Sequence, residues 1–186
     1  MDVDENLKPI EGSEQLIECD TLILSVGLIP ENEISEKLNI ELSPKTKGAY
    51  VDNNLQTLTD GVFAAGNCLS VNDLVDYVSE NGFIAGKAAA IYSKRKEKRN
   101  LIKVKSSQGV LTCIPQYIDL NSDRSNITFY LRSDANYVNK EVIVKCDDNI
   151  LFKKSYKRVN QAESIKFNLD LNNINKDIEV DIIWNK

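Results

Sequence analysis

The chain has 186 residues, of which 42% are hydrophobic and 27% charged, and these proportions are typical of a globular protein with one large or two small domains. It contains no histidine, which excludes a Ser-His or Cys-His nucleophile, a His-ligated metal and an imidazole acid-base catalyst. The net charge of −5 is uneven: residues 1–93 hold 16 acidic and 5 basic residues, residues 94–105 hold 1 and 7, and residues 106–186 hold 11 of each. This distribution predicts three segments.

No apolar run approaches the ~20 residues that a membrane-spanning helix needs, and the first residues are acidic where a secretory signal would be basic and then apolar. We therefore expect a cytoplasmic protein with no membrane span. The four cysteines form no closely spaced pair of the kind found in zinc sites or redox dithiols. They predict reduced and mostly buried thiols, and no metal site.

The first segment begins with the apolar run Thr21–Gly27, which is typical of a strand buried on both faces. A short helix is predicted over residues 31–38. Two more short strands are predicted over residues 49–52 and 61–66, the second entered through an Asp60-Gly61 turn. Strands and helices in this order predict an α/β layer.

The clearest helix is predicted over residues 71–93, with Ser70 or Asn72 as its cap and with Asp73 and Asp76 in its first turn. The basic run that follows, residues 94–99, is interpreted as the end of this helix and the start of a linker that extends to residue 105. A nucleic-acid or anionic-membrane surface is the alternative. It is disfavoured because no aromatic residue is interleaved and the preceding domain is acidic.

Beyond residue 106 the hydrophobic period changes to two, which indicates strands. About six strands and no helix are expected, and a small β-sandwich would bury one apolar face of each sheet. The predicted strands cover Val110–Ile118, Ile127–Leu131, Val142–Cys146, Ile150–Tyr156, Ile165–Leu169 and Ile178–Trp184.

The segment Thr57-Leu58-Thr59-Asp60-Gly61-Val62-Phe63-Ala64-Ala65-Gly66-Asn67-Cys68 resembles the second flavin-binding motif of the FAD-dependent pyridine nucleotide-disulfide oxidoreductase superfamily. That resemblance implies that Gly66 lets the backbone approach the cofactor and that the next side chain hydrogen-bonds a ribityl hydroxyl. Most of the superfamily has aspartate at this second position, whereas this chain has Asn67. It also implies that the following helix directs its N-terminus at the pyrimidine edge of the isoalloxazine, where the helix dipole stabilises the negative charge of reduction.

The cofactor-binding residues implied by the resemblance are Gly66, Asn67, Val71, Asn72, Asp73, Leu74 and Val75. The alternative is a strand-turn-helix unit whose small residues serve close packing only. No catalytic residue is assigned, and Cys68 is interpreted as a packed thiol rather than a redox group.

Upstream, residues 18–32 resemble the segment in which the family's chain leaves the NAD(P)-binding domain and re-enters the FAD domain. Residues 3–91 as a whole are similar to the group that includes the larger subunits of opine oxidase and hydrogen cyanide synthase and the glycerol-3-phosphate-dehydrogenase-linked FAD oxidoreductases. The fold implied is a partial, three-layer FAD/NAD(P)-binding α/β domain over residues 1–93, a basic linker over 94–105 and a β-sandwich-like domain over 106–186. No two glycines are spaced as Gly-x-Gly, so both phosphate-binding turns are expected upstream of Met1.

The resemblance thus implies a C-terminal fragment of an FAD-dependent, NAD(P)-linked oxidoreductase that is inactive alone and binds FAD only with its N-terminal half. The alternative is a non-catalytic interaction module whose β-sandwich docks a partner subunit or electron carrier. A third hypothesis, a standalone α/β domain for an unrelated small ligand, requires the motif to be coincidental. A homodimer is left open, because exposed strand edges invite association.

Overall fold

The computed structural model describes every residue except 7, 25–26, 95–97 and 185–186. Eight strands form two sheets in the described part of the chain, one of five strands in the order β3-β1-β8-β5-β6 and one of three in the order β2-β4-β7. β1 and β8 are parallel and the other pairs are antiparallel, so the larger sheet is mixed. The strands are β1 (Leu101–Ser106), β2 (Val110–Ile114), β3 (Tyr117–Asp119), β4 (Ile127–Ser133), β5 (Tyr137–Cys146), β6 (Asn149–Val159), β7 (Ile165–Leu169) and β8 (Ile178–Trp184).

The two sheets share one hydrophobic core, built from the alternate residues that the period of two assigns to one face of each strand. The aromatic rings join the sheets directly. Phe152 of β6 stacks on Phe167 of β7 at 4.7 Å between ring centroids, and Phe167 stacks on Phe129 of β4 at 5.3 Å. The strands predicted over residues 127–131, 142–146, 150–156, 165–169 and 178–184 are therefore confirmed, and we call residues 101–184 the β domain.

Two strand predictions in this domain need correction. The stretch predicted as one strand over Val110–Ile118 is divided into β2 and β3, with Pro115 between them, because proline has no N–H to donate to a ladder. β1 occupies residues that were assigned to the linker. Its alternation of buried Ile102 and Val104 with exposed Lys103 and Lys105 is a strand pattern within the predicted linker.

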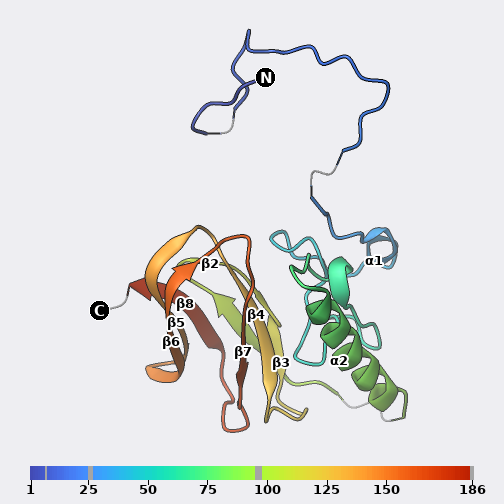
Figure 1. Ribbon diagram of the computed structural model, residues 1–186. Coiled ribbons are helices and arrows are strands. Elements are labelled where there is room, and N and C mark those ends of the chain that lie inside the picture. The colour runs from blue at the N-terminus through green and yellow to red at the C-terminus, as the bar shows by residue number, and fades with distance from the viewer. Residues whose placement is uncertain (7, 25–26, 95–97, 185–186) are drawn as a thin grey trace.

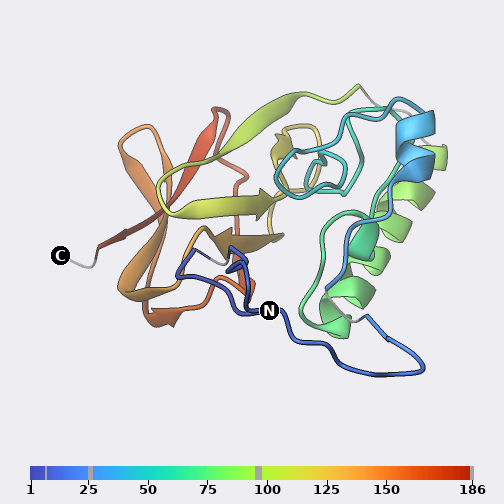
Figure 2. The same ribbon diagram turned by 90° about the horizontal axis from the view of Figure 1, so that it is seen from above.

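The described part of residues 1–94 contains a short helix α1 (Glu33–Lys37), a 3-10 turn η1 (Gly66–Cys68) and the long helix α2 (Val75–Lys94). Both helices were predicted, although α2 begins four residues later than expected. Figure 1 shows α2 beside the β domain and the described residues among 1–24 running away from the rest of the molecule, and Figure 2 shows α1 and α2 on the same side.

The predicted buried strand Thr21–Gly27 is wrong for the residues that are described. Leu22, Ile23 and Leu24 are 71–86% exposed and unpaired, and Ser25 and Val26 lie outside the described residues. A strand needs a neighbour for its backbone groups, and none of the described residues supplies one here. The strands predicted over 49–52 and 61–66 are reduced to isolated bridges, Leu42 to Ala49, Val51 to Thr57 and Gln56 to Phe63. The three-layer arrangement therefore stays a prediction, and the observed fold is mostly β-sheet with few helices.

Candidate functional site

The flavin-like motif begins in a compact loop, residues 51–65, that packs under α2. Val51, Leu55 and Leu69 form a small core with Ala85 of α2 and Ile114 of the β domain. The predicted Asp60-Gly61 turn is confirmed: Val62 donates its N–H to the Thr59 carbonyl, and Gly61 has φ +77°, a conformation that favours glycine. The loop is thus held on both sides, by the helix and by the β domain.

Gly66 opens the turn η1 with φ +69° and is buried. A Cβ here would lie 3.2 Å from Cγ1 of Val78, so glycine permits both the left-handed conformation and the close approach of α2. The Gly66 carbonyl accepts the N–H groups of Leu69 and Ser70. Gly66 therefore has a packing role that is independent of any cofactor.

Asn67 lies next to Gly66 and its side chain is exposed. Its Oδ1 accepts the backbone N–H of Asn72 at 3.1 Å, which closes the loop between η1 and α2. The structure thus brings two of the predicted cofactor residues, Asn67 and Asn72, into direct contact. An aspartate in place of Asn67 would accept the same bond, and the asparagine adds an amide donor.

The remaining predicted residues line the entry to α2. Because the helix begins at Val75, Ser70 and Asn72 do not adjoin it, and Asp73 precedes its first turn, so only Asp76 is an acidic residue of that turn. Leu74 is 51% and Val75 77% exposed. The first amides of α2 have no acceptor within the helix, so this end carries partial positive charge.

Asn67, Leu74 and Val75 are exposed near the buried Gly66, whose backbone is in the left-handed region, so a ligand could reach them. Asn67 would hold a ribityl hydroxyl and the start of α2 would lie against the pyrimidine edge. Bound flavin would supply the electron-accepting ring. None of the seven predicted residues supplies a phosphate-binding turn.

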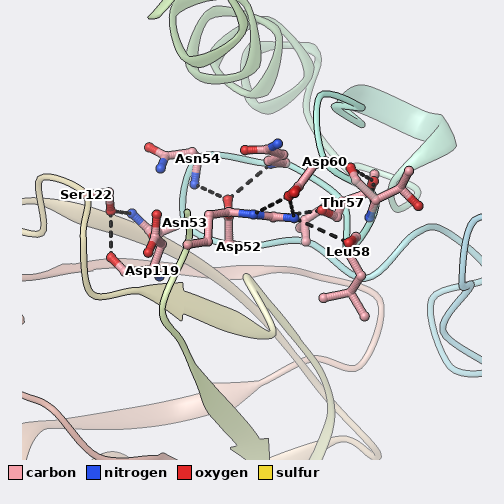
Figure 3. A network of polar contacts seen from close by, with 12 residues as sticks. Asp52, Asn53, Asn54, Thr57, Leu58, Asp60, Asp119 and Ser122 are labelled. Atoms are coloured by element: carbon pink, nitrogen blue, oxygen red, sulfur yellow. Dashed lines mark hydrogen bonds and ion pairs between the residues drawn. The ribbon is translucent and has the colours of Figure 1, made fainter. Parts of the chain in front are cut away.

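A polar network holds the motif loop to the chain that follows α2 (Figure 3). The Arg99 guanidinium donates to Asp52 Oδ2 at 3.0 Å, to Asp60 Oδ1 at 2.6 Å and to the carbonyls of Thr57 and Leu58. The Asp52 side chain is fully buried and that of Arg99 is 10% exposed. Burial raises the pKa of Asp52, although the hydrogen bond from Arg99 opposes the rise.

Sequence reasoning missed this role of Arg99, since the residue lies in a run of bases interpreted as a linker. Its partners are about 40 residues away, and a basic run carries no sign of which member is buried. The only available signal was the pair of aspartates, Asp52 and Asp60, beside the two predicted strands.

The cysteine prediction is half wrong. Cys113 and Cys146 are buried, and burial raises the pKa of Cys113 to about 12, whereas Cys19 and Cys68 are exposed. Cys68 is therefore not packed: its thiol donates to the Ala65 carbonyl at 3.0 Å on the surface of the turn η1. No two of these thiols are joined in a disulfide.

An open groove of about 520 Å³ lies between α2, from Glu80 to Tyr92, the motif loop and the loop from β3 to β4. Phe83, Ile84 and Ile91 line its helix side, and Asn121 and Asn126 line its loop side. Its volume falls in the range of small-molecule sites, but none of the predicted cofactor residues lines it. Phe63 of the flavin-like motif also lines the groove, so the groove adjoins the motif but not its predicted cofactor residues.

Residues 1–82 match the model of the family described as pyridine nucleotide-disulphide oxidoreductase. Two curated relatives, both named nitric oxide reductase FlRd-NAD(+) reductase, come from Escherichia coli and Shigella sonnei. Each is 32% identical over 62 residues, which is 33% of this chain and 16% of the relative. The chain thus covers a small part of these relatives. Together the matches support a pyridine nucleotide-disulfide oxidoreductase family for the N-terminal segment.

The comparison with solved structures gave no match. In the part of the chain that the structure describes, no helix combines the length and apolar character needed to cross a membrane. The same residues contain no group of three or more carboxylates or thiols arranged to hold a metal ion.

Proposed function

We propose that this chain is the C-terminal part of an FAD-dependent oxidoreductase that passes electrons between a nicotinamide nucleotide, FAD and a further acceptor. The observation that carries the proposal is the turn at Gly66 and Asn67, joined by a short loop to the start of α2 at Val75. Its support from the comparisons is the family match over residues 1–82. The relatives' printed name, an NAD(+) reductase, agrees with a nicotinamide nucleotide as one of the redox partners.

In this function the chain's own residues orient and stabilise rather than transfer protons. Asn67 holds a ribityl hydroxyl, and residues 71–75 present the positive end of α2 to the ring, where it stabilises the negative charge of reduction. The N-terminal half of the flavoprotein supplies both phosphate-binding turns. The finer assignment, to the opine oxidase, hydrogen cyanide synthase and glycerol-3-phosphate-dehydrogenase-linked group, belongs to this proposal.

The test is a titration with FAD followed by flavin fluorescence, performed on the purified chain with and without a separately expressed N-terminal half. Binding only when both halves are present supports the proposal. Asn67→Ala should then weaken binding by about fivefold, the usual effect of one hydrogen bond, while Asn149→Ala, at the exposed first residue of β6, leaves it unchanged. Failure of both arrangements to bind FAD would refute the flavin assignment.

A second candidate function, an interaction module, is favoured by one specific observation. β6 is an edge strand of the larger sheet and carries the exposed residues Lys153, Lys154, Lys157 and Arg158. A basic, unpaired edge fits an acidic face of a partner subunit or electron carrier, although lysines on an edge also prevent unwanted pairing. Partner binding that persists without the N-terminal half, and falls in Lys154→Glu, would support this function.

A further inference from the structure

The β domain contacts the predicted flavin-facing loop through Arg132 and through the backbone of Ser164. Arg132 of β4 donates from Nη2 to the Val71 carbonyl at 3.0 Å and also pairs with Asp73 Oδ1. Both side chains of the pair are largely buried, at 23% and 21% exposed. The second oxygen of Asp73 accepts the backbone N–H of Ser164 at 2.5 Å. Both carboxylate oxygens of Asp73 are therefore occupied by the β domain.

A second cluster fixes α2 about two turns further along. Glu80 accepts the Tyr130 hydroxyl at 2.5 Å and the Lys166 ammonium at 2.6 Å. Tyr130 and Lys166 face each other across the β4–β7 ladder, and Tyr130 and Arg132 lie two apart on β4, on one face of the strand. Burial alone would raise the pKa of Glu80, but the bonds from Lys166 and Tyr130 hold it below its usual value.

These contacts tie the loop before α2, and α2 itself at Glu80, to the neighbouring strands β4 and β7. We propose that Arg132 is a positioning residue for the flavin: it fixes Val71 and Asp73, and through them the direction in which the first amides of α2 point. This inference rests on the proposed function, because it takes residues 71–75 as the flavin-facing segment. Arg132 acts through the loop and does not itself contact the cofactor.

The proposal gives the β domain a part in flavin chemistry. Hydrogen-bond donors stabilise developing charge best when they are already oriented before the reaction. If the donors had to reorient first, the free energy of that reorganisation would offset the stabilisation that their bonds contribute. A loop that is held in place therefore raises the reduction potential of the flavin, and a mobile loop lowers it.

The first arm of the test needs no flavin. Amide hydrogen exchange of residues 70–78 is measured by mass spectrometry in the whole chain and in Arg132→Met, Arg132→Lys and Arg158→Met. Loss of a charge-assisted bond should speed exchange there about tenfold in Arg132→Met, with partial rescue in Arg132→Lys. Arg158→Met, an exposed arginine of β6, is the matched control and should leave exchange unchanged.

If Arg132→Met does not fold, Asp73→Asn removes the same ion pair from the loop side. Unchanged exchange at residues 70–78 in a folded variant overturns the proposal.

The second arm measures the reduction potential and absorption spectrum of FAD bound to the protein reassembled with its N-terminal half. A lower potential and a shifted spectrum in Arg132→Met, restored towards wild type in Arg132→Lys, support the proposal. A loosened loop with potential and spectrum unchanged overturns it.

The two failures can be told apart. Wild-type protein that binds no FAD with the N-terminal half present refutes the proposed function, and with it any role of Arg132 towards a flavin. In that case the hydrogen-exchange measurement still shows whether Arg132 holds the loop before α2 in place.

Discussion

Arg99→Met should strongly lower the free energy of unfolding. It leaves the carboxylate of Asp52, whose side chain is fully buried, without its cation. Removing one partner of a buried ion pair costs about 3–5 kcal/mol, because the remaining charge stays buried and unpaired. Asp60→Asn is the matched control: it removes the other acidic partner of Arg99, but Asp60 is 73% exposed, so we expect a loss below about 1 kcal/mol.

The free energy of unfolding is measured by urea titration at pH 7 and again at acid pH. Because the folded pKa of Asp52 is raised above its usual value of 3.8, this group favours the folded state below that pH, and its contribution is lost as the pH rises through the folded pKa. Without Arg99 that pKa rises further. The deficit of Arg99→Met should therefore shrink as the pH falls and Asp52 becomes neutral.

Adding Asp52→Asn to Arg99→Met should recover part of the loss at pH 7, since the amide oxygen still accepts the N–H groups of Asn54 and Gln56. A loss below about 1 kcal/mol in Arg99→Met at pH 7, unchanged in acid, would refute the reasoning, because Asp52 would then not depend on Arg99 for its charge.

Three further predictions use local geometry. Gly48→Ala places a Cβ 1.9 Å from the Leu69 carbonyl oxygen and should lower the unfolding free energy by about 3 kcal/mol, whereas Gly86→Ala, with open space on α2, should raise it by about 0.5–1 kcal/mol; urea titration checks both. Glu80 has a lowered pKa, so the stability it contributes is present above pH 4.5 and lost as the pH falls through its folded pKa; acid titration of stability should be flatter in Glu80→Gln. A thiol reagent should react with two cysteines in the native protein and with all four after denaturation, and reaction of the buried pair in native protein would contradict the structure.

The strands of the β domain were predictable because an alternating pattern is local and the core that it faces is complete. Ile178, Val180 and Ile182 are each at most 1% exposed, as their period of two requires. Even β1, which was missed, carries the pattern. The basic residues of β1 were interpreted as part of a linker. Lysines on the exposed face of a strand are nevertheless compatible with its pairing to a neighbouring strand.

The same kind of reasoning was wrong at residues 21–24 for a different reason. An apolar run predicts that a segment will be buried, but burial depends on strands elsewhere. The roles of Arg99 and Arg132 were beyond sequence reasoning altogether. Arg99 lies 47 residues from Asp52, and Arg132 lies 59 residues from Asp73, so no local period or motif connects them.

The exposed apolar residues show where the two parts of the chain differ. Of the nineteen large hydrophobic residues that are exposed in the described part, sixteen lie within residues 1–94 and only three in the β domain. The β domain has thus covered its own apolar surface, while the segment with the family match has not.

α2 illustrates the difference within one element. One side is fixed to the β domain through Glu80, whereas Val75 and Phe83 are 77% and 73% exposed. A flavoprotein domain completed by an N-terminal half would cover such residues, and the FAD reconstitution proposed above would then also reduce the binding of a hydrophobic dye to this segment.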